Sequence, residues 1–140
     1  MLQLLADGAR LLARFTQTEN PGGVRQLLDL GVPVTARYEG DGYFGIPKDS
    51  TALHVAAWLL RPTMVKLLLE RSAPVDARDG RGRTPLALAV RASVDSYWTE
   101  RRSPGLVEAL LRAGASVSGV PFPSGYAEGD DLLRRYGAKQ

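Results

Sequence analysis

Three segments of the chain repeat one pattern, and this repetition constrains the fold more than any other feature of the sequence. They span residues 24–34, 65–75 and 107–117. In each, apolar residues recur at the i, i+3 and i+4 spacing of a helix with one buried face, and a turn follows. Units of this kind cannot bury their apolar faces alone and stack on one another. We therefore expect a stack of repeated helical units.

The end of each repeated helix carries its own signal. Gly31 and Gly114 fall just past the helix ends, where glycine adopts a left-handed conformation without steric cost. Ser72 stands at the same place in the second copy, so that turn is expected to be strained or differently shaped. A weaker fourth copy over residues 132–138 closes the chain.

A second pattern precedes two of these helices, over residues 50–57 and 83–90. Thr51 and Thr84 begin it and lie 33 residues apart. A threonine hydroxyl caps the free N–H groups of a helix, and proline, here Pro85, fits the first helical turn. The alanines that follow let neighbouring helices approach closely. Each complete unit should therefore contain two helices.

These motifs resemble those of the ankyrin-repeat family. The family's helix-start motif corresponds to residues 51–54 and 84–87, and its second-helix and turn signature to residues 65–77 and 107–117. The resemblance implies an all-α ankyrin-repeat solenoid, made of stacked helix-turn-helix units with extended finger loops. It also implies that His54 is structural, bonded to Thr51 or to the neighbouring loop. Ala87 replaces the histidine in the following unit, so the corresponding bond should be lost.

Two insertions enlarge the repeat, because the equivalent valines lie 41 and 42 residues apart instead of 33. Eight extra residues within 38–49 lengthen the first finger, and nine, roughly 93–102, extend the next first helix or the turn after it. We expect one domain over residues 1–140. Its approximate units are a degenerate N-terminal cap (1–36), two full units (37–77 and 78–118) and a truncated C-terminal cap (119–140).

Composition limits the function classes. The 140 residues include no cysteine, which excludes disulfides and thiolate metal sites, and one histidine is too few for an ordinary zinc site. We expect no metal and no cofactor; the alternative is a calcium site on the oxygen ligands of Glu39, Asp41 and Asp49, whose spacing does not match an EF-hand loop. The net charge of +3 is too small to favour nucleic-acid binding. No apolar run approaches the length of a membrane helix, and no targeting signal is visible, so a cytoplasmic location is expected.

Aromatic and arginine side chains gather in the insertions and fingers, and such residues dominate the energy of protein interfaces. We predict a module without catalytic activity that binds an unidentified protein or peptide through its finger loops and concave face. The predicted contact residues on the finger side are Tyr43, Phe44, Arg78 and Arg81. Those of a second patch are Tyr97, Trp98, Arg101 and Arg102. In the family's geometry the second patch lies at the end opposite the fingers.

Several alternatives stay open at this point. The inserted aromatic residues can instead anchor the insertions, and the finger arginines can pair with Asp76 and Asp79. The chain is expected to be a monomer, the alternative being a structural or regulatory subunit that self-associates through its insertions. A further alternative is an enzyme whose carboxylate site comprises Glu39, Asp41 and Asp49.

Overall fold

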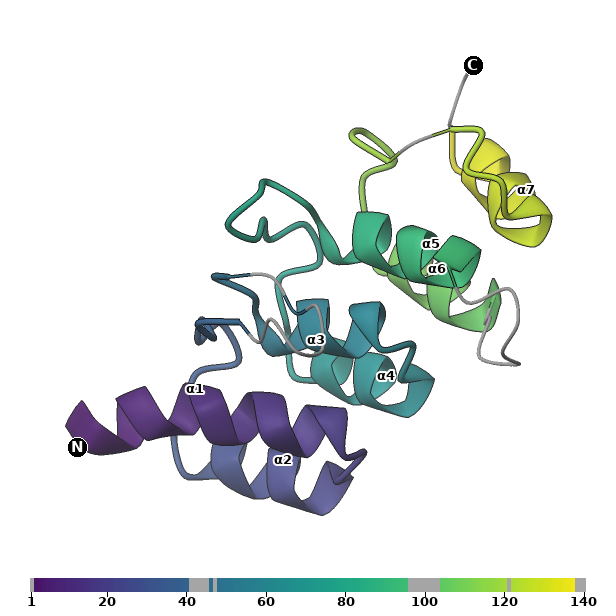
Figure 1. The fold of residues 1–140 in the computed structure, drawn as a ribbon. Helices are drawn as coiled ribbons and strands as arrows, with labels where there is room; N and C mark the ends of the chain where they lie inside the picture. Colours follow the sequence, from purple (N-terminus) through teal and green to yellow (C-terminus); the bar gives the residue numbers. More distant parts are fainter. Residues whose placement is uncertain (1, 41–45, 47, 96–103, 121, 138–140) are drawn as a thin grey trace.

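The fold consists of helices stacked in pairs (Figure 1). The computed structural model describes residues 2–40, 46, 48–95, 104–120 and 122–137. The helices in these ranges are α1 (Leu2–Gln17), α2 (Pro21–Asp29), α3 (Ala52–Trp58), α4 (Pro62–Glu70), α5 (Pro85–Asp95), α6 (Pro104–Arg112) and α7 (Ala127–Arg135). The chain also has an isolated β-bridge between Tyr38 and Ser50. The predicted all-α repeat fold is confirmed.

The helices form two layers. In each of the pairs α1/α2, α3/α4 and α5/α6, the two helices pack together. The first helices stack as α1, α3 and α5, and the second helices stack beside them as α2, α4, α6 and α7 (Figure 1). The loops that join one pair to the next project from one side of the stack. These loops are the predicted fingers.

The turn inside a pair has the same backbone in the first two pairs. Glu19 and Leu60 have positive φ angles of 55° and 56°. The next residues, Asn20 and Arg61, are the N-caps of α2 and α4, each with a proline at the start of the helix. Leu60 is only 4% exposed, so burial of its side chain offsets the cost of a left-handed leucine.

The turn after each second helix also repeats its backbone. Gly31, Gly114 and Gly137 have φ angles of 105°, 99° and 104°. Ser72, at the same place after α4, has a φ of 65°. The turn at Ser72 therefore has the same backbone shape as the others. Because serine has a Cβ and glycine does not, the left-handed conformation is strained at Ser72.

One continuous core runs through the stack. It is built from the facing apolar sides of the helices, and its fully buried members include Leu53, Leu68, Leu86, Leu110 and Leu133. Trp58 is partly buried and packs against this core, as well as against a smaller cluster formed by Ala13, Ile46 and Val55. Each unit therefore depends on its neighbours for burial.

The last unit has a single helix in the part of the chain that the structure describes. α7 packs against α6, in the layer of second helices. The segment before it is irregular, but Val117, Val120 and Phe122 pack on the core and Tyr126 is 1% exposed. This irregular segment stands where a full unit would have its first helix.

Both insertions begin where the sequence predicts them. Tyr38 and Ser50 exchange two backbone hydrogen bonds of 2.7 and 3.2 Å, which close the base of the first finger around residues 39–49. α5 has 11 residues against 7 for α3, so the second insertion starts by extending the first helix. Its remainder, residues 96–103, lies outside the described residues. The unit boundaries at residues 36, 77 and 118 stay predictions.

Candidate functional site

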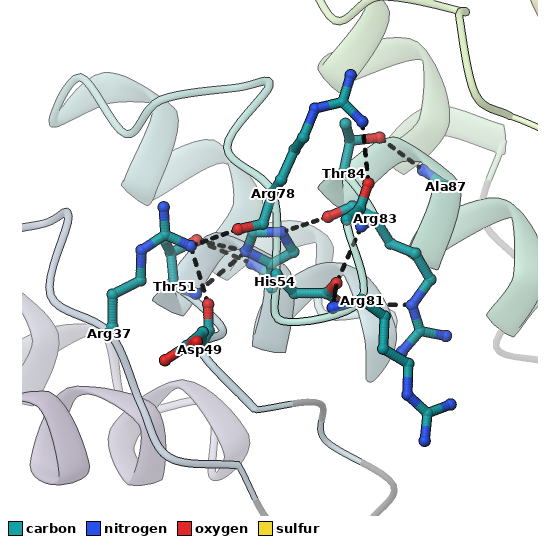
Figure 2. A network of polar contacts seen from close by, with 11 residues as sticks. Arg37, Asp49, Thr51, His54, Arg78, Arg81, Arg83, Thr84 and Ala87 are labelled. Atoms are coloured by element: carbon teal, nitrogen blue, oxygen red, sulfur yellow. Dashed lines mark hydrogen bonds and ion pairs between the residues drawn. The ribbon is translucent and has the colours of Figure 1, made fainter.

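His54 lies in the first turn of α3, where it contacts finger 2, and is fully buried. Finger 1 comprises residues 33–50 and finger 2 comprises residues 74–84. The His54 Nδ1 accepts from the Thr51 backbone N–H at 3.1 Å, and its Nε2 lies 2.9 Å from the carbonyl oxygen of Arg83 (Figure 2). Both partners considered from the sequence are thus present. His54 caps its own helix and also holds finger 2 against α3.

These contacts fix the form of the imidazole. A backbone N–H can only donate, so Nδ1 is the acceptor and Nε2 carries the proton that is donated to the Arg83 carbonyl. Burial lowers the pKa of His54 below its ordinary value of 6.5, although the bond to the Arg83 carbonyl acts in the opposite direction. His54 is therefore a neutral structural link and is not placed as a general base.

The start of α5 repeats this arrangement without the histidine. Thr84 is buried, and its Oγ1 accepts from the backbone N–H of Ala87 at 3.3 Å, while Pro85 is the first helical residue. Because Ala87 has no ring nitrogen, this helix start lacks the additional link to the next finger that His54 provides.

Finger 2 is organised around the carboxylate of Asp79, whose side chain is fully buried. One oxygen accepts from the backbone N–H groups of Arg81 and Arg83, both at 2.9 Å, and the other accepts from the Arg83 Nε at 3.3 Å. The charge of Arg83 is therefore paired within the finger. The same loop leaves Arg78 and Arg81 exposed.

Arg37 joins the two fingers, and the sequence interpretation missed it. Its Nη1 donates to the carbonyl oxygens of Asp49 and Arg78, at 2.8 and 2.6 Å (Figure 2). The Gly80 N–H donates to the Lys48 carbonyl oxygen at 2.8 Å, which adds a second link. The sequence does contain a signal for Arg37. Residues 33–37 align with residues 74–78, so Arg37 occupies the position in finger 1 that Arg78 occupies in finger 2.

The predicted contact residues fall into two groups. Arg78 and Arg81 lie exposed on finger 2, and their side chains extend in different directions from it (Figure 2). The Arg78 Nη1 donates to the Gly82 carbonyl oxygen at 3.0 Å, and neither arginine pairs with a carboxylate in the described ranges. The other predicted contacts lie outside the described residues; they are Tyr43, Phe44, Tyr97, Trp98, Arg101 and Arg102.

A hollow of about 420 Å³ opens beside these fingers, between α1 and finger 1. Ala9, Pro33, Ala36 and Tyr38 supply its apolar lining. Its charged lining residues, Arg10, Arg37 and Glu39, are exposed. Sequence patterns gave no signal for this hollow, because it depends on the distance between a helix and a loop that are far apart in the chain.

Finger 1 carries the carboxylates of the alternative catalytic site. Glu39 and Asp49 are exposed, and Asp41 lies outside the described residues. Among the residues that the structure describes, no three histidine, aspartate or glutamate side chains are placed to hold a metal ion. The described helices also include none that is long and apolar enough to cross a membrane.

A stack of paired helices with finger loops on one side defines a helical-repeat protein. The family model "Ankyrin repeat" matches residues 48–80, from the end of finger 1 to finger 2. A putative ankyrin repeat protein of Rickettsia bellii is 29% identical over 151 aligned residues, which cover 94% of this chain and 59% of that protein. The fold and these matches support an ankyrin-repeat protein.

Two further relatives match shorter stretches. Serine/threonine-protein kinase 12 of Arabidopsis thaliana is 36% identical over 60% of this chain, and human B-cell lymphoma 3 protein is 44% identical over 51%. The alignments span 17% and 15% of those proteins. The chain thus corresponds to a part of each curated relative. Ankyrin repeats generally mediate protein–protein interaction and are typically non-catalytic.

Proposed function

We propose that this protein is a non-catalytic interaction module that binds a protein or peptide through its finger loops and concave face. The observation that carries the proposal is the set of hydrogen bonds that joins fingers 1 and 2. His54, Arg37 and Gly80 hold the loops in one arrangement through backbone carbonyl oxygens. A surface that is ordered before binding loses less conformational entropy when a partner arrives.

The side chains that this arrangement presents fit such a role. Arg78 and Arg81 project from finger 2 while Asp79, which could have neutralised them, is fully used by backbone N–H groups and by Arg83. Exposed arginines with a fixed backbone are effective contact residues at interfaces. Tyr43 and Phe44 are proposed to extend this contact, and Tyr97, Trp98, Arg101 and Arg102 to form a second patch. A cytoplasmic location is part of the same proposal.

Affinity capture from native extract tests the proposal with matched variants. Arg78→Ala/Arg81→Ala and Tyr43→Ala/Phe44→Ala should each reduce recovery of a partner that the unmodified protein retains. Trp98→Ala/Arg101→Ala tests the second patch. The control is Arg25→Ala/Arg135→Ala, which removes two exposed arginines from α2 and α7, away from the fingers.

Unfolding curves must first establish that every variant is folded. Equal partner recovery by the folded finger variants and the control would reject the finger contacts. Light scattering over a concentration series separates the rival function, since a self-associating subunit increases in mass with concentration whereas a binder of other proteins stays monomeric.

A further inference from the structure

We infer that the hollow between α1 and finger 1 binds an extended acidic peptide segment, with one apolar side chain of the segment inside the hollow. This inference rests on the proposed function and names the chemistry of the partner. The partner's acidic side chains would meet Arg10 and Arg37 at the hollow and Arg78 and Arg81 farther along finger 2.

The hollow has ample room for an apolar side chain. Its volume of about 420 Å³ lies within the range of small-ligand pockets. Ala9 and Ala36 leave space because they are short, and the partly buried Tyr38 is held by its backbone bonds to Ser50 and by packing against Ala13 and Ile46. Binding to an apolar lining is most favourable for a side chain without polar groups, because a buried polar group without a hydrogen-bond partner costs free energy.

The arginines around it carry charge that the chain does not neutralise. The Arg37 guanidinium donates to two carbonyl oxygens and that of Arg78 to one. Arg10 and Arg81 form no ion pair within the described ranges. Carbonyl oxygens fix the position of a guanidinium but leave its charge for a carboxylate, with which it forms short, strong hydrogen bonds.

The acids of the same surface do not cancel this charge. In finger 2, Asp79 is paired with Arg83, and the Asp76 Oδ1 accepts from the backbone N–H of Ser116 at 2.9 Å. Glu39 and Asp49 are the exposed acids of finger 1 in the described ranges. Counted with the exposed Asp7 and Asp76, they are fewer than the basic residues Arg10, Arg37, Lys48, Arg78 and Arg81, so the described part of this surface has a small positive excess that complements an acidic segment.

The position of Arg37 favours an extended segment over a compact ligand. Its guanidinium lies on the hollow and also reaches the backbone of Arg78, so finger 2 begins directly beside the hollow. An extended peptide places alternate side chains on opposite faces, with a rise of about 3.3 Å per residue. Such a segment can put an apolar side chain in the hollow and acidic side chains on the arginines beyond it.

Selection from a random peptide library displayed on phage, with peptides of about twelve residues, tests the inference. We expect the selected peptides to carry aspartate or glutamate beside an apolar residue. Their synthetic fluorescent forms should bind Arg10→Ala about tenfold more weakly than the unmodified protein. They should bind Arg25→Ala, which removes an exposed arginine of α2, with unchanged affinity. Added salt should weaken binding to the unmodified protein more than binding to Arg10→Ala.

A second variant tests the hollow independently of charge. Ala9→Leu keeps a good helix former in α1 and fills part of the space, so it should weaken binding of the same peptides while leaving the unfolding free energy nearly unchanged. Replacing the apolar residue of the peptide by serine should weaken binding to the unmodified protein and have less effect with Ala9→Leu.

Three outcomes overturn the inference. The library can yield only basic or neutral peptides, or no peptide at all. The selected peptides can bind Arg10→Ala and Arg25→Ala with equal affinity, or the protein can self-associate with rising concentration in a way that Arg10→Ala abolishes. Each of these outcomes leaves the proposed function separately testable. If partner capture still depended on Arg78 and Arg81, the proposed interaction module would stand, and only this site and its acidic ligand would be rejected.

Discussion

At the scale of single residues, His54 makes stability depend on pH. Burial lowers its pKa in the folded protein, so below about pH 6.5 the unfolded chain binds a proton that the folded protein does not. The stabilising effect of neutral His54 is complete above that pH and is lost as the pH falls toward the lowered value. The free energy of unfolding should therefore fall between about pH 7.5 and about pH 5.5.

The variant His54→Asn isolates this effect, because the chain has no other histidine. It should be less stable than the unmodified protein at the higher pH, since Thr51 and the Arg83 carbonyl lose a buried partner. Its free energy of unfolding should change less between the two pH values. Urea denaturation measures both quantities, and equal pH dependence in the two proteins would contradict the assignment.

Ser72 is a second residue that affects stability, in this case through its backbone conformation. It is exposed and has a φ of 65°, whereas glycines occupy the equivalent places after α2 and α6. Ser72→Gly should raise the free energy of unfolding by about 1 kcal/mol, because it removes the strain of a left-handed Cβ. Gly31→Ser is the matched reverse change and should lower it by a similar amount. No gain from Ser72→Gly in thermal or urea unfolding would refute the strain.

At the scale of elements, the two fingers depend on the absence of a side chain at Gly80. A Cβ there would lie 2.9 Å from the Lys48 carbonyl oxygen, the atom that accepts the Gly80 N–H. Gly80→Ala should therefore separate the fingers and destabilise the protein by about 1–2 kcal/mol. Hydrogen exchange should show weaker protection of finger 2.

Gly22→Ala provides the control, since the nearest atom to its added Cβ is the Asn20 side chain at 3.7 Å and the residue lies in α2. It should stabilise the protein slightly, as alanine does in helices. A Gly80→Ala variant with unaltered finger protection would mean that the contact between Lys48 and Gly80 does not hold the loops together.

The elements also show what sequence could and could not predict. Helical periodicity and cap residues predicted the paired helices and the places of Thr51 and Thr84, because these signals depend on neighbours in the chain. Leu60 carries no local signal for a positive φ, and Val120 and Phe122 follow no helical period although they pack on the core. Long-range packing sets these features. The same holds for the hollow, which joins Arg10 to Arg37 across distant segments.

At the scale of the whole molecule, the main contacts between the described helices join neighbouring units, and the ends of the stack should behave differently from its middle. Leu133 in α7 and Leu53 in α3 are both 0% exposed. Leu133, however, lies in a single helix packed on α6, whereas α3 packs on α1, α4 and α5. In a one-dimensional stack, loss of a terminal contact frays one end, and loss of a central contact weakens the coupling between both halves.

Substitution of these two leucines by alanine tests that organisation. Either change removes buried apolar contacts, and such a loss lowers local stability by about 2–5 kcal/mol. Leu133→Ala should speed hydrogen exchange in α7 and residues 116–126 while α1 to α4 keep their protection. Leu53→Ala should speed exchange on both sides of α3 and lower the midpoint of global unfolding further. Equal loss of protection along the whole chain in both variants would indicate a single cooperative core, in which α7 is as central to stability as α3.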